Sequence, residues 1–135
     1  MPAILVSALM NLSRMKNIRD PKDLVALLKE FFPPFEQEWA KAEADDAEQA
    51  AYTGYQVELT FHDVLQVFAP LSAELLKAAS SKQVSEFCKF INESIVIPGS
   101  LENAISTCLL EHASQIGIRK LLLPFLSRMA KKELR

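Results

Sequence analysis

Apolar residues recur at helical spacing along this chain, in stretches separated by prolines, glycines and short polar residues that can cap a helix. The first clear stretch follows Asp20-Pro21, a pair typical of a helix N-terminus, because aspartate accepts free backbone N–H groups and proline suits the first turn. The apolar positions behind it are Leu24, Leu27, Leu28 and Phe31. Their spacing predicts a helix with one buried face, which Pro33-Pro34 ends.

The next segment is expected to form a second helix, from about Pro34 through Trp39 to about Gln49. Residues 52–59 then break the helical pattern. One short strand would fit their composition, but a lone strand has no partner for its backbone hydrogen bonds. We therefore predict an ordered loop over residues 52–59.

Three further helix starts are marked by a side chain that can cap the backbone and a second polar side chain three residues later. These pairs are Thr60 with Asp63, Ser80 with Gln83, and Ser100 with Asn103. Pro70 is expected to interrupt the first of these helices, so that a short further helix follows it. Gly117 is expected to end the third, and Pro124 to kink or split the last helix of the chain.

The buried faces of the later helices can be read from the same spacing. The helix that follows Thr60 is expected to bury Phe61, Val64, Leu65 and Phe68, and the helix that follows Ser80 to bury Val84, Phe87, Cys88, Ile91 and Ile95. The helix that follows Ser100 is expected to bury Leu101, Ala104, Ile105, Cys108, Leu109 and His112. The last helix is expected to bury Ile118, Leu121, Leu122, Phe125 and Met129. About seven or eight short helices joined by short turns pack as antiparallel pairs. The sequence therefore predicts a compact all-α bundle, forming a single helical domain over residues 1–135.

The composition agrees with an ordered helical protein, since 50% of the residues are hydrophobic, 24% are charged and only three are glycine. Two cysteines make no disulfide framework. The apolar start, Met1–Met10, lacks the basic region of a signal peptide, and no stretch reaches the roughly 20 apolar residues that span a bilayer. We expect a cytoplasmic protein that does not enter membranes.

The net charge of −2 gives no reason to expect nucleic acid as a partner, but charge is unevenly distributed. Residues 36–48 hold one lysine, Lys41, among acidic residues, and residues 119–135 hold one acidic residue, Glu133, among basic ones. The acidic residues of the first stretch are Glu36, Glu38, Glu43, Asp45, Asp46 and Glu48; the basic residues of the second are Arg119, Lys120, Arg128, Lys131, Lys132 and Arg135. One region of the chain is thus acidic and another is basic.

The acidic stretch has two interpretations that the sequence leaves open: a solvated helix face, or a docking surface for a basic partner. Three aromatic residues, Trp39, Tyr52 and Tyr55, lie within or beside it, either as interface anchors or as core residues. The candidate partner-binding residues are Glu36, Trp39, Glu43, Asp45, Asp46, Glu48, Tyr52 and Tyr55.

Motifs that carry chemistry are missing: there is no glycine-rich phosphate loop and no His-Glu-x-x-His pair. Cys108 and His112 share one helical face, and together with Cys88 they could hold zinc or pair a thiol with a base. Buried, inert cysteines and a histidine at the edge of the core explain the same residues with fewer assumptions. We expect no catalytic residue, no metal and no cofactor.

Two segments carry a family resemblance: Phe87-Cys-Lys-Phe-Ile-Asn-Glu-Ser94 and Leu101-Glu-Asn-Ala-Ile-Ser-Thr-Cys-Leu-Leu-Glu-His112. Together, within about residues 60–125, they resemble small all-helical immunity proteins of polymorphic and secreted bacterial toxin systems, such as those using type VI secretion. The shared positions are mainly apolar, with Asn103 and Glu111 in addition. The resemblance implies a non-enzymatic protein that binds a toxin of its own cell.

The leading hypothesis from the sequence is therefore an immunity protein that neutralises a cognate antibacterial toxin by direct binding. The alternative is a helical adaptor or regulatory subunit that self-associates as a homodimer through its apolar N-terminal segment, Ala3 to Met10.

Overall fold

The computed structural model describes residues 18–55 and 58–135, so the apolar segment from Ala3 to Met10 lies outside the described residues. The described residues contain α-helices and no strand, which confirms the all-α prediction. The seven α-helices are α2 (Pro21–Phe31), α3 (Phe35–Thr53), α4 (Phe61–Ala78), α5 (Ser81–Ser94), α6 (Ser100–Ile105), α7 (Arg119–Leu122) and α8 (Arg128–Glu133). A π-helical segment, η1 (Ser106–Leu110), follows α6, and a 3-10 turn, η2 (Leu123–Phe125), follows α7.

Side-chain caps fix where α2, α4 and α5 begin, and all three predicted starts are confirmed. In α4 the Asp63 N–H donates to Thr60 Oγ1 at 3.1 Å, while the Thr60 N–H donates to Asp63 Oδ2 at 2.9 Å. This reciprocal pair satisfies N–H groups that have no partner inside the helix. The predicted Ser100–Asn103 cap is wrong: α6 begins after Gly99 and has no side-chain cap.

The prediction that Pro70 interrupts its helix is also wrong, because α4 runs without a break from Phe61 to Ala78. Pro70 has no N–H to donate to the Gln66 carbonyl, four residues earlier, and both Pro70 and Gln66 are exposed. On either side of Pro70, Ala69 and Ser72 are buried, and the Ser72 hydroxyl donates to the Ala69 carbonyl at 2.7 Å. Burial of one face of α4 thus outweighs the local preference of proline for ending a helix.

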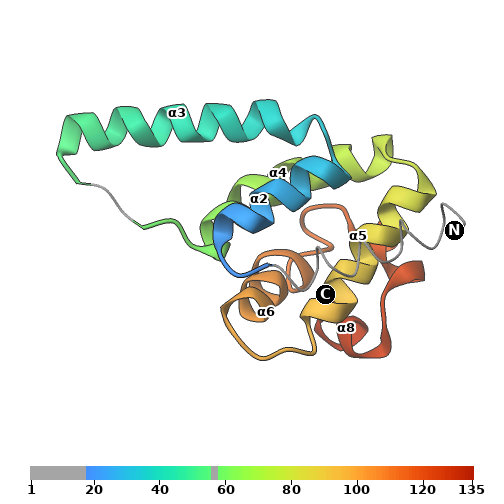
Figure 1. Ribbon diagram of the computed structural model, residues 1–135. Coiled ribbons are helices and arrows are strands. Elements are labelled where there is room, and N and C mark those ends of the chain that lie inside the picture. Colours follow the sequence, from blue (N-terminus) through green and yellow to red (C-terminus); the bar gives the residue numbers. More distant parts are fainter. Residues whose placement is uncertain (1–17, 56–57) are drawn as a thin grey trace, which may run out of the picture.

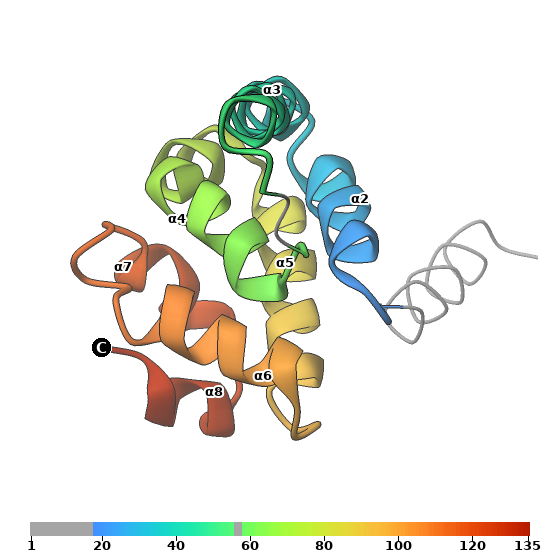
Figure 2. The same cartoon turned by 90° about the vertical axis from the view of Figure 1, so that its left-hand side faces the viewer.

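The helices pack around α4 and α5, as Figures 1 and 2 show. α2 contacts α3, α4 and α5, whereas α6 and α8 lie on the other side of the molecule. In both views α3 forms the top edge and α8 lies at the bottom. No helix among the described residues is long and apolar enough to cross a membrane.

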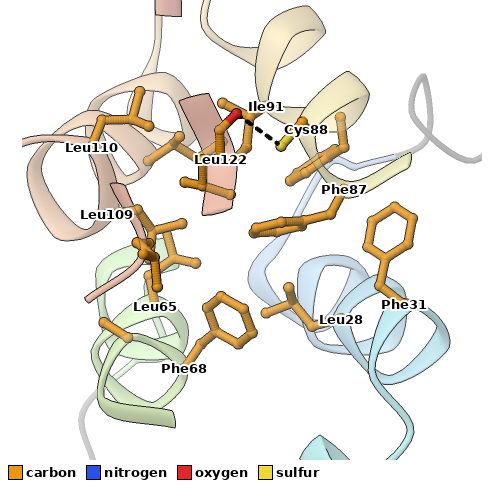
Figure 3. Close-up of a cluster of buried hydrophobic side chains, with 14 of the residues drawn as sticks. Leu28, Phe31, Leu65, Phe68, Phe87, Cys88, Ile91, Leu109, Leu110 and Leu122 are labelled. Carbon is orange, nitrogen blue, oxygen red and sulfur yellow. Dashed lines mark hydrogen bonds between the residues drawn. The ribbon is translucent and has the colours of Figure 1, made fainter. Parts of the chain in front are cut away.

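Phenylalanine rings form the centre of the core (Figure 3). The Phe87 ring of α5 lies 5.9 Å from Phe31 and 5.2 Å from Phe32, at the end of α2, and 5.6 Å from Phe68 of α4. Phe68 in turn lies 5.7 Å from Phe35, the first residue of α3. Edge-on and tilted contacts of this kind add to the free energy of apolar burial. The rings therefore join four helices at one point.

The helix predicted behind Ser100 loses its regular form after Ile105. In the π-helical segment η1 the Glu111 N–H donates to the Ser106 carbonyl at 2.9 Å, five residues back. The Leu110 carbonyl is then free to accept from the Arg135 N–H at 2.8 Å, so the last described residue covers this segment. Irregular backbone here is supported by a contact distant in sequence, which local spacing does not reveal.

Pro124 splits the last predicted helix into α7, η2 and α8, as expected. The Asn92 side chain of α5 fixes the turn between η2 and α8: its Nδ2 donates to the Phe125 carbonyl at 3.1 Å, and its Oδ1 accepts from the Ser127 N–H at 2.8 Å. The predicted inward orientation of Phe125 and Met129 is wrong, because both side chains are exposed. The residues buried instead are Leu126, Ala130 and Leu134.

Cys88 belongs to the core, as the simpler interpretation predicted (Figure 3). It is a free cysteine with no exposed surface, and its Sγ lies 3.9 Å from the Leu122 carbonyl. Burial disfavours the charged thiolate, which raises the pKa of this thiol to about 12. A neutral buried thiol packs as a small apolar group and is a poor nucleophile.

The ring cluster predicts a large effect of truncating Phe87. Phe87→Ala removes a buried ring that touches three others, so we expect the free energy of unfolding to fall by about 3–5 kcal/mol. The same change at exposed Phe125 should cost clearly less, since that ring keeps part of its contact with water in the folded protein. Urea denaturation followed by circular dichroism measures both, and equal losses would contradict the central role of Phe87.

The raised pKa of Cys88 predicts a pH dependence of stability. The unfolded thiol ionises near its ordinary value of 9.0, whereas the folded thiol holds its proton up to about pH 12. Between these values the unfolded chain binds fewer protons, so this contribution to stability is full below 9.0 and is lost as pH rises toward 12. Urea unfolding of wild type and Cys88→Ala should therefore differ progressively less across this window, and a constant difference would contradict the prediction.

Candidate partner-binding surface on helix α3

Helix α3 is anchored at its beginning and projects at its end. Its buried side chains, Phe35 and Trp39, both lie in the first two turns. Every residue from Glu43 to Gln49 is exposed, which covers nearly two full turns of helix. Figure 1 shows this half of α3 running out past the rest of the molecule. Between Glu43 and Gln49, α3 is therefore a helix without a buried side chain.

Local features explain why the projecting half is nevertheless helical. α3 contains six alanines, the residue with the highest helix propensity. At its end the Gly54 N–H donates to the Ala50 carbonyl at 2.8 Å, and Gly54 adopts the left-handed conformation (φ 70°) that ends many helices. The Thr53 hydroxyl also donates to the Gln49 carbonyl at 2.9 Å. The helix runs four residues beyond the predicted end at Gln49, so the loop after it is shorter than expected.

The projecting half carries negative charge that its own helix does not neutralise. Glu43 and Asp46, and likewise Asp45 and Glu48, are spaced so that like charges face each other on the helix surface. They lie toward the negative end of the helix dipole, and the last turn of α3 holds no basic residue. Lys41 lies before them, and its Nζ is 3.4 Å from Glu38 Oε1 in an exposed pair. A cation brought by a partner would relieve this repulsion.

Two tyrosines stand beside these acids with almost nothing covering them. The side chain of Tyr52 is 92% exposed and that of Tyr55 is 73% exposed. Exposed tyrosines next to charges are typical of binding surfaces, since each supplies a large rigid ring and a hydroxyl group. We define the acidic end as the group Glu43, Asp45, Asp46, Glu48, Tyr52 and Tyr55.

Two of the predicted binding residues do not belong to the acidic end. Trp39 is buried, with its ring 6.1 Å from that of Phe35, so of its two interpretations the structure favours a core residue. It anchors α3 to the core, as the spacing of Phe35, Trp39 and half-buried Ala42 could have indicated. Glu36 is exposed but lies in the first turn of α3, where a carboxylate complements the positive end of the helix dipole.

The structure does not assemble Cys88, Cys108 and His112 into a site. Cys88 is buried, Cys108 is half-buried beside the Thr107 hydroxyl at 3.8 Å, and His112 is exposed with its Nδ1 2.9 Å from Gln115 Oε1. The predicted inward orientation of His112 is therefore wrong. Within residues 18–55 and 58–135 no group of three or more histidine, cysteine or acidic side chains is placed to hold a metal ion.

Sequence spacing also missed a second exposed apolar group, far from the acidic end in the fold. Val96 and Ile97, in the turn between α5 and α6, are 51% and 67% exposed, and Met129 of α8 is 52% exposed. Phe125, in the turn that Asn92 holds against α5, is partly exposed as well. A signal was available for Val96 and Ile97, because they precede Pro98-Gly99 and lie past the last buried position of α5, Ile95.

Comparison with known proteins places the chain in a family. No curated protein and no solved structure matches it significantly. A family model described as a domain of unknown function, DUF7674, matches residues 25–135, which covers every helix from α3 to α8 and most of α2. The chain therefore belongs to the DUF7674 family, whose function is not known.

Proposed function

We propose that this protein is an immunity protein, which neutralises a toxin of its own cell by binding it through the acidic end of α3. The observation that carries the proposal is the projecting end of α3, where the four carboxylates between Glu43 and Glu48 are exposed and two exposed tyrosines follow them. A surface of this kind is suited to a basic protein partner. Many toxins that act on nucleic acids are basic, because their substrate is a polyanion.

Charge supports the proposal through the rate of association. Residues 43–58 include Glu43, Asp45, Asp46, Glu48 and Glu58, and no lysine or arginine. A cluster of one sign on a projecting element extends the field into solvent and steers a partner of opposite charge toward it. An inhibitor must capture its toxin before the toxin reaches its target, so fast association is a functional advantage.

The exposed tyrosines support the proposal through affinity. Tyr52 lies in the last turn of α3, and Tyr55 follows Gly54, with its N–H bonded to Thr53 Oγ1 at 3.2 Å. Both are thus attached to an already formed helix end, so little conformational entropy is lost when a partner covers them. Rigid aromatic side chains with charges around them are the usual composition of an interface hot spot.

The identity of the partner as a toxin rests on the resemblance described above. The segments that carry it correspond to α5 and to α6 with η1, which belong to the body of the bundle. The acidic end lies outside these segments. In the proposed mechanism the body supplies a stable scaffold, and α3 supplies the surface that recognises one particular toxin.

Charge reversal on α3 tests the proposal. We expect Asp45→Lys with Glu48→Lys to weaken binding to the cognate toxin by at least about tenfold, because two attractive charges become repulsive. The matched control is Glu36→Lys with Glu74→Lys, which makes the same charge change at exposed positions outside the acidic end. Affinity is measured by calorimetry, and rescue of growth by co-expression.

Two results would contradict the proposal in different ways. If the wild-type chain neither rescues growth nor forms a complex with the toxin, the immunity function is wrong. If a complex forms and both double variants bind as tightly as wild type, the function stands but the acidic end is not the binding surface.

A further inference from the structure

Six large hydrophobic side chains are exposed on the described part of the chain. Two of the six, Tyr52 and Tyr55, belong to the acidic end of α3. The other four are Val96, Ile97, Phe125 and Met129. Large apolar side chains grouped on a surface are typical of contact sites rather than of surface that stays in water.

The second group lies around one fixed turn. The Asn92 side chain bonds both the Phe125 carbonyl and the Ser127 N–H, which ties the start of α8 to the end of α5. Val96 follows Asn92 by four residues, just past the end of α5, so the two are within about one turn of each other along the chain. α8 contacts α5, and the turn from α5 to α6 lies beside α8 at the bottom of Figures 1 and 2.

Helix α8, which carries Met129 of this second group, is basic. Arg128, Lys131 and Lys132 are all exposed on α8, and the single acid of that helix, Glu133, is half-buried. We define the basic end as the group Val96, Ile97, Phe125, Arg128, Met129, Lys131 and Lys132. Four carboxylates of the acidic end thus have a counterpart in three cations of the basic end, and both ends present exposed apolar side chains.

The two ends cannot meet within one molecule. α3 lies at the top and α8 at the bottom in both views, with α4 and α5 between them (Figures 1 and 2). The acidic end also points away from the body of the bundle (Figure 1). The acidic end and the basic end therefore do not cover each other within the described part of one molecule.

We propose that the occupant of the basic end is a second copy of this chain, docked by its acidic end. Lys131 and Lys132 of one copy then face Asp45, Asp46 and Glu48 of the next, while Tyr52 and Tyr55 cover the apolar side chains of the basic end. Because the two contacting surfaces differ, the contact is head-to-tail, and each added copy presents a new free end. The protein assembles into chains of variable length, and salt weakens the assembly by screening.

Assembly of copies goes beyond the proposed function, and it requires the toxin and a second copy to compete for the acidic end. The acidic end cannot hold a toxin and a second copy at once, so toxin binding breaks the chain at that copy. The basic end takes no part in toxin binding. Changes confined to the basic end therefore separate the two ideas.

Sedimentation velocity over a range of protein and salt concentrations is the first experiment. Wild type should show a weight-average mass that rises with concentration and falls with added salt. Asp45→Lys with Glu48→Lys should be monomeric, and so should Lys131→Glu with Lys132→Glu. The matched control for the basic end is Lys77→Glu with Lys82→Glu, which changes exposed lysines elsewhere and should assemble like wild type.

Mixing the two monomeric variants distinguishes head-to-tail assembly from other modes. Each variant keeps one intact end, and the two reversed ends are again opposite in charge, so the mixture should assemble although neither variant does so alone. All four reversals on one chain should restore assembly, because the exchanged charges are again opposite. A wild-type chain that stays monomeric at every concentration would overturn the inference. So would assembly that the basic-end reversal leaves unchanged, since that result indicates pairing through α3 alone or through another segment.

Carbodiimide cross-linking uses the wild-type chain, so its result does not depend on whether a variant folds correctly. It should join Lys131 or Lys132 of one copy to Asp45, Asp46 or Glu48 of another, at low salt and not at high salt. Cross-links between copies that avoid both ends would overturn the inference. If Lys131→Glu with Lys132→Glu abolishes assembly and leaves the affinity for the toxin unchanged, both ideas stand. If the wild-type chain assembles but binds no toxin, only the proposed function is wrong.

Discussion

Contacts among phenylalanine rings at the junction of α2, α3, α4 and α5 hold this fold together. Phe87 touches Phe31, Phe32 and Phe68, and Phe68 touches Phe35. Because Phe35 is the first residue of α3, the cluster grips that helix at its N-terminal end. The direction in which α3 leaves the core, and the length of helix that stays free, follow from this one point of attachment.

Because α3 is attached to the core at one end, the residues that stabilise the fold are not the residues proposed to bind a partner. Truncating a core ring removes buried area and leaves a cavity, whereas changes at Asp45, Asp46 or Glu48 alter a surface that packs on nothing. Such a surface can change its charges and aromatic side chains without affecting the core. That separation suits a protein whose partner changes while its scaffold is kept, as the proposed toxin inhibitor requires.

Local signals in the sequence predicted much of the fold. The caps at Asp20, Thr60 and Ser80 are formed by the expected pairs, and the apolar faces of α2 and α5 are buried as their spacing indicated. These features depend on residues within one or two turns of each other. For the same reason the charge and position of the acidic stretch were visible in the sequence.

The predictions that failed depended on contacts distant in sequence. α4 continues through Pro70 because its other face is buried against neighbouring helices, and η1 departs from α-helical form where the Arg135 N–H reaches the Leu110 carbonyl. The outward orientation of Phe125 follows from the turn that Asn92 holds in place. Trp39 was ambiguous because an aromatic residue beside acids fits a core and an interface equally well, and its burial became evident only with the position of Phe35.

The central claim is that α3 stays exposed from Glu43 to Gln49 until a partner covers it. Amide hydrogen exchange of the isolated protein, resolved by residue, tests this most directly. At low protein concentration and high salt, where copies stay apart, the account predicts that amides from Ala47 to Thr53 exchange through local opening at free energies well below those of Leu28 to Phe31 in α2, which approach the free energy of global unfolding. Equal and strong protection along the whole of α3 would show that its second half is held in place within the isolated protein, and would contradict the account.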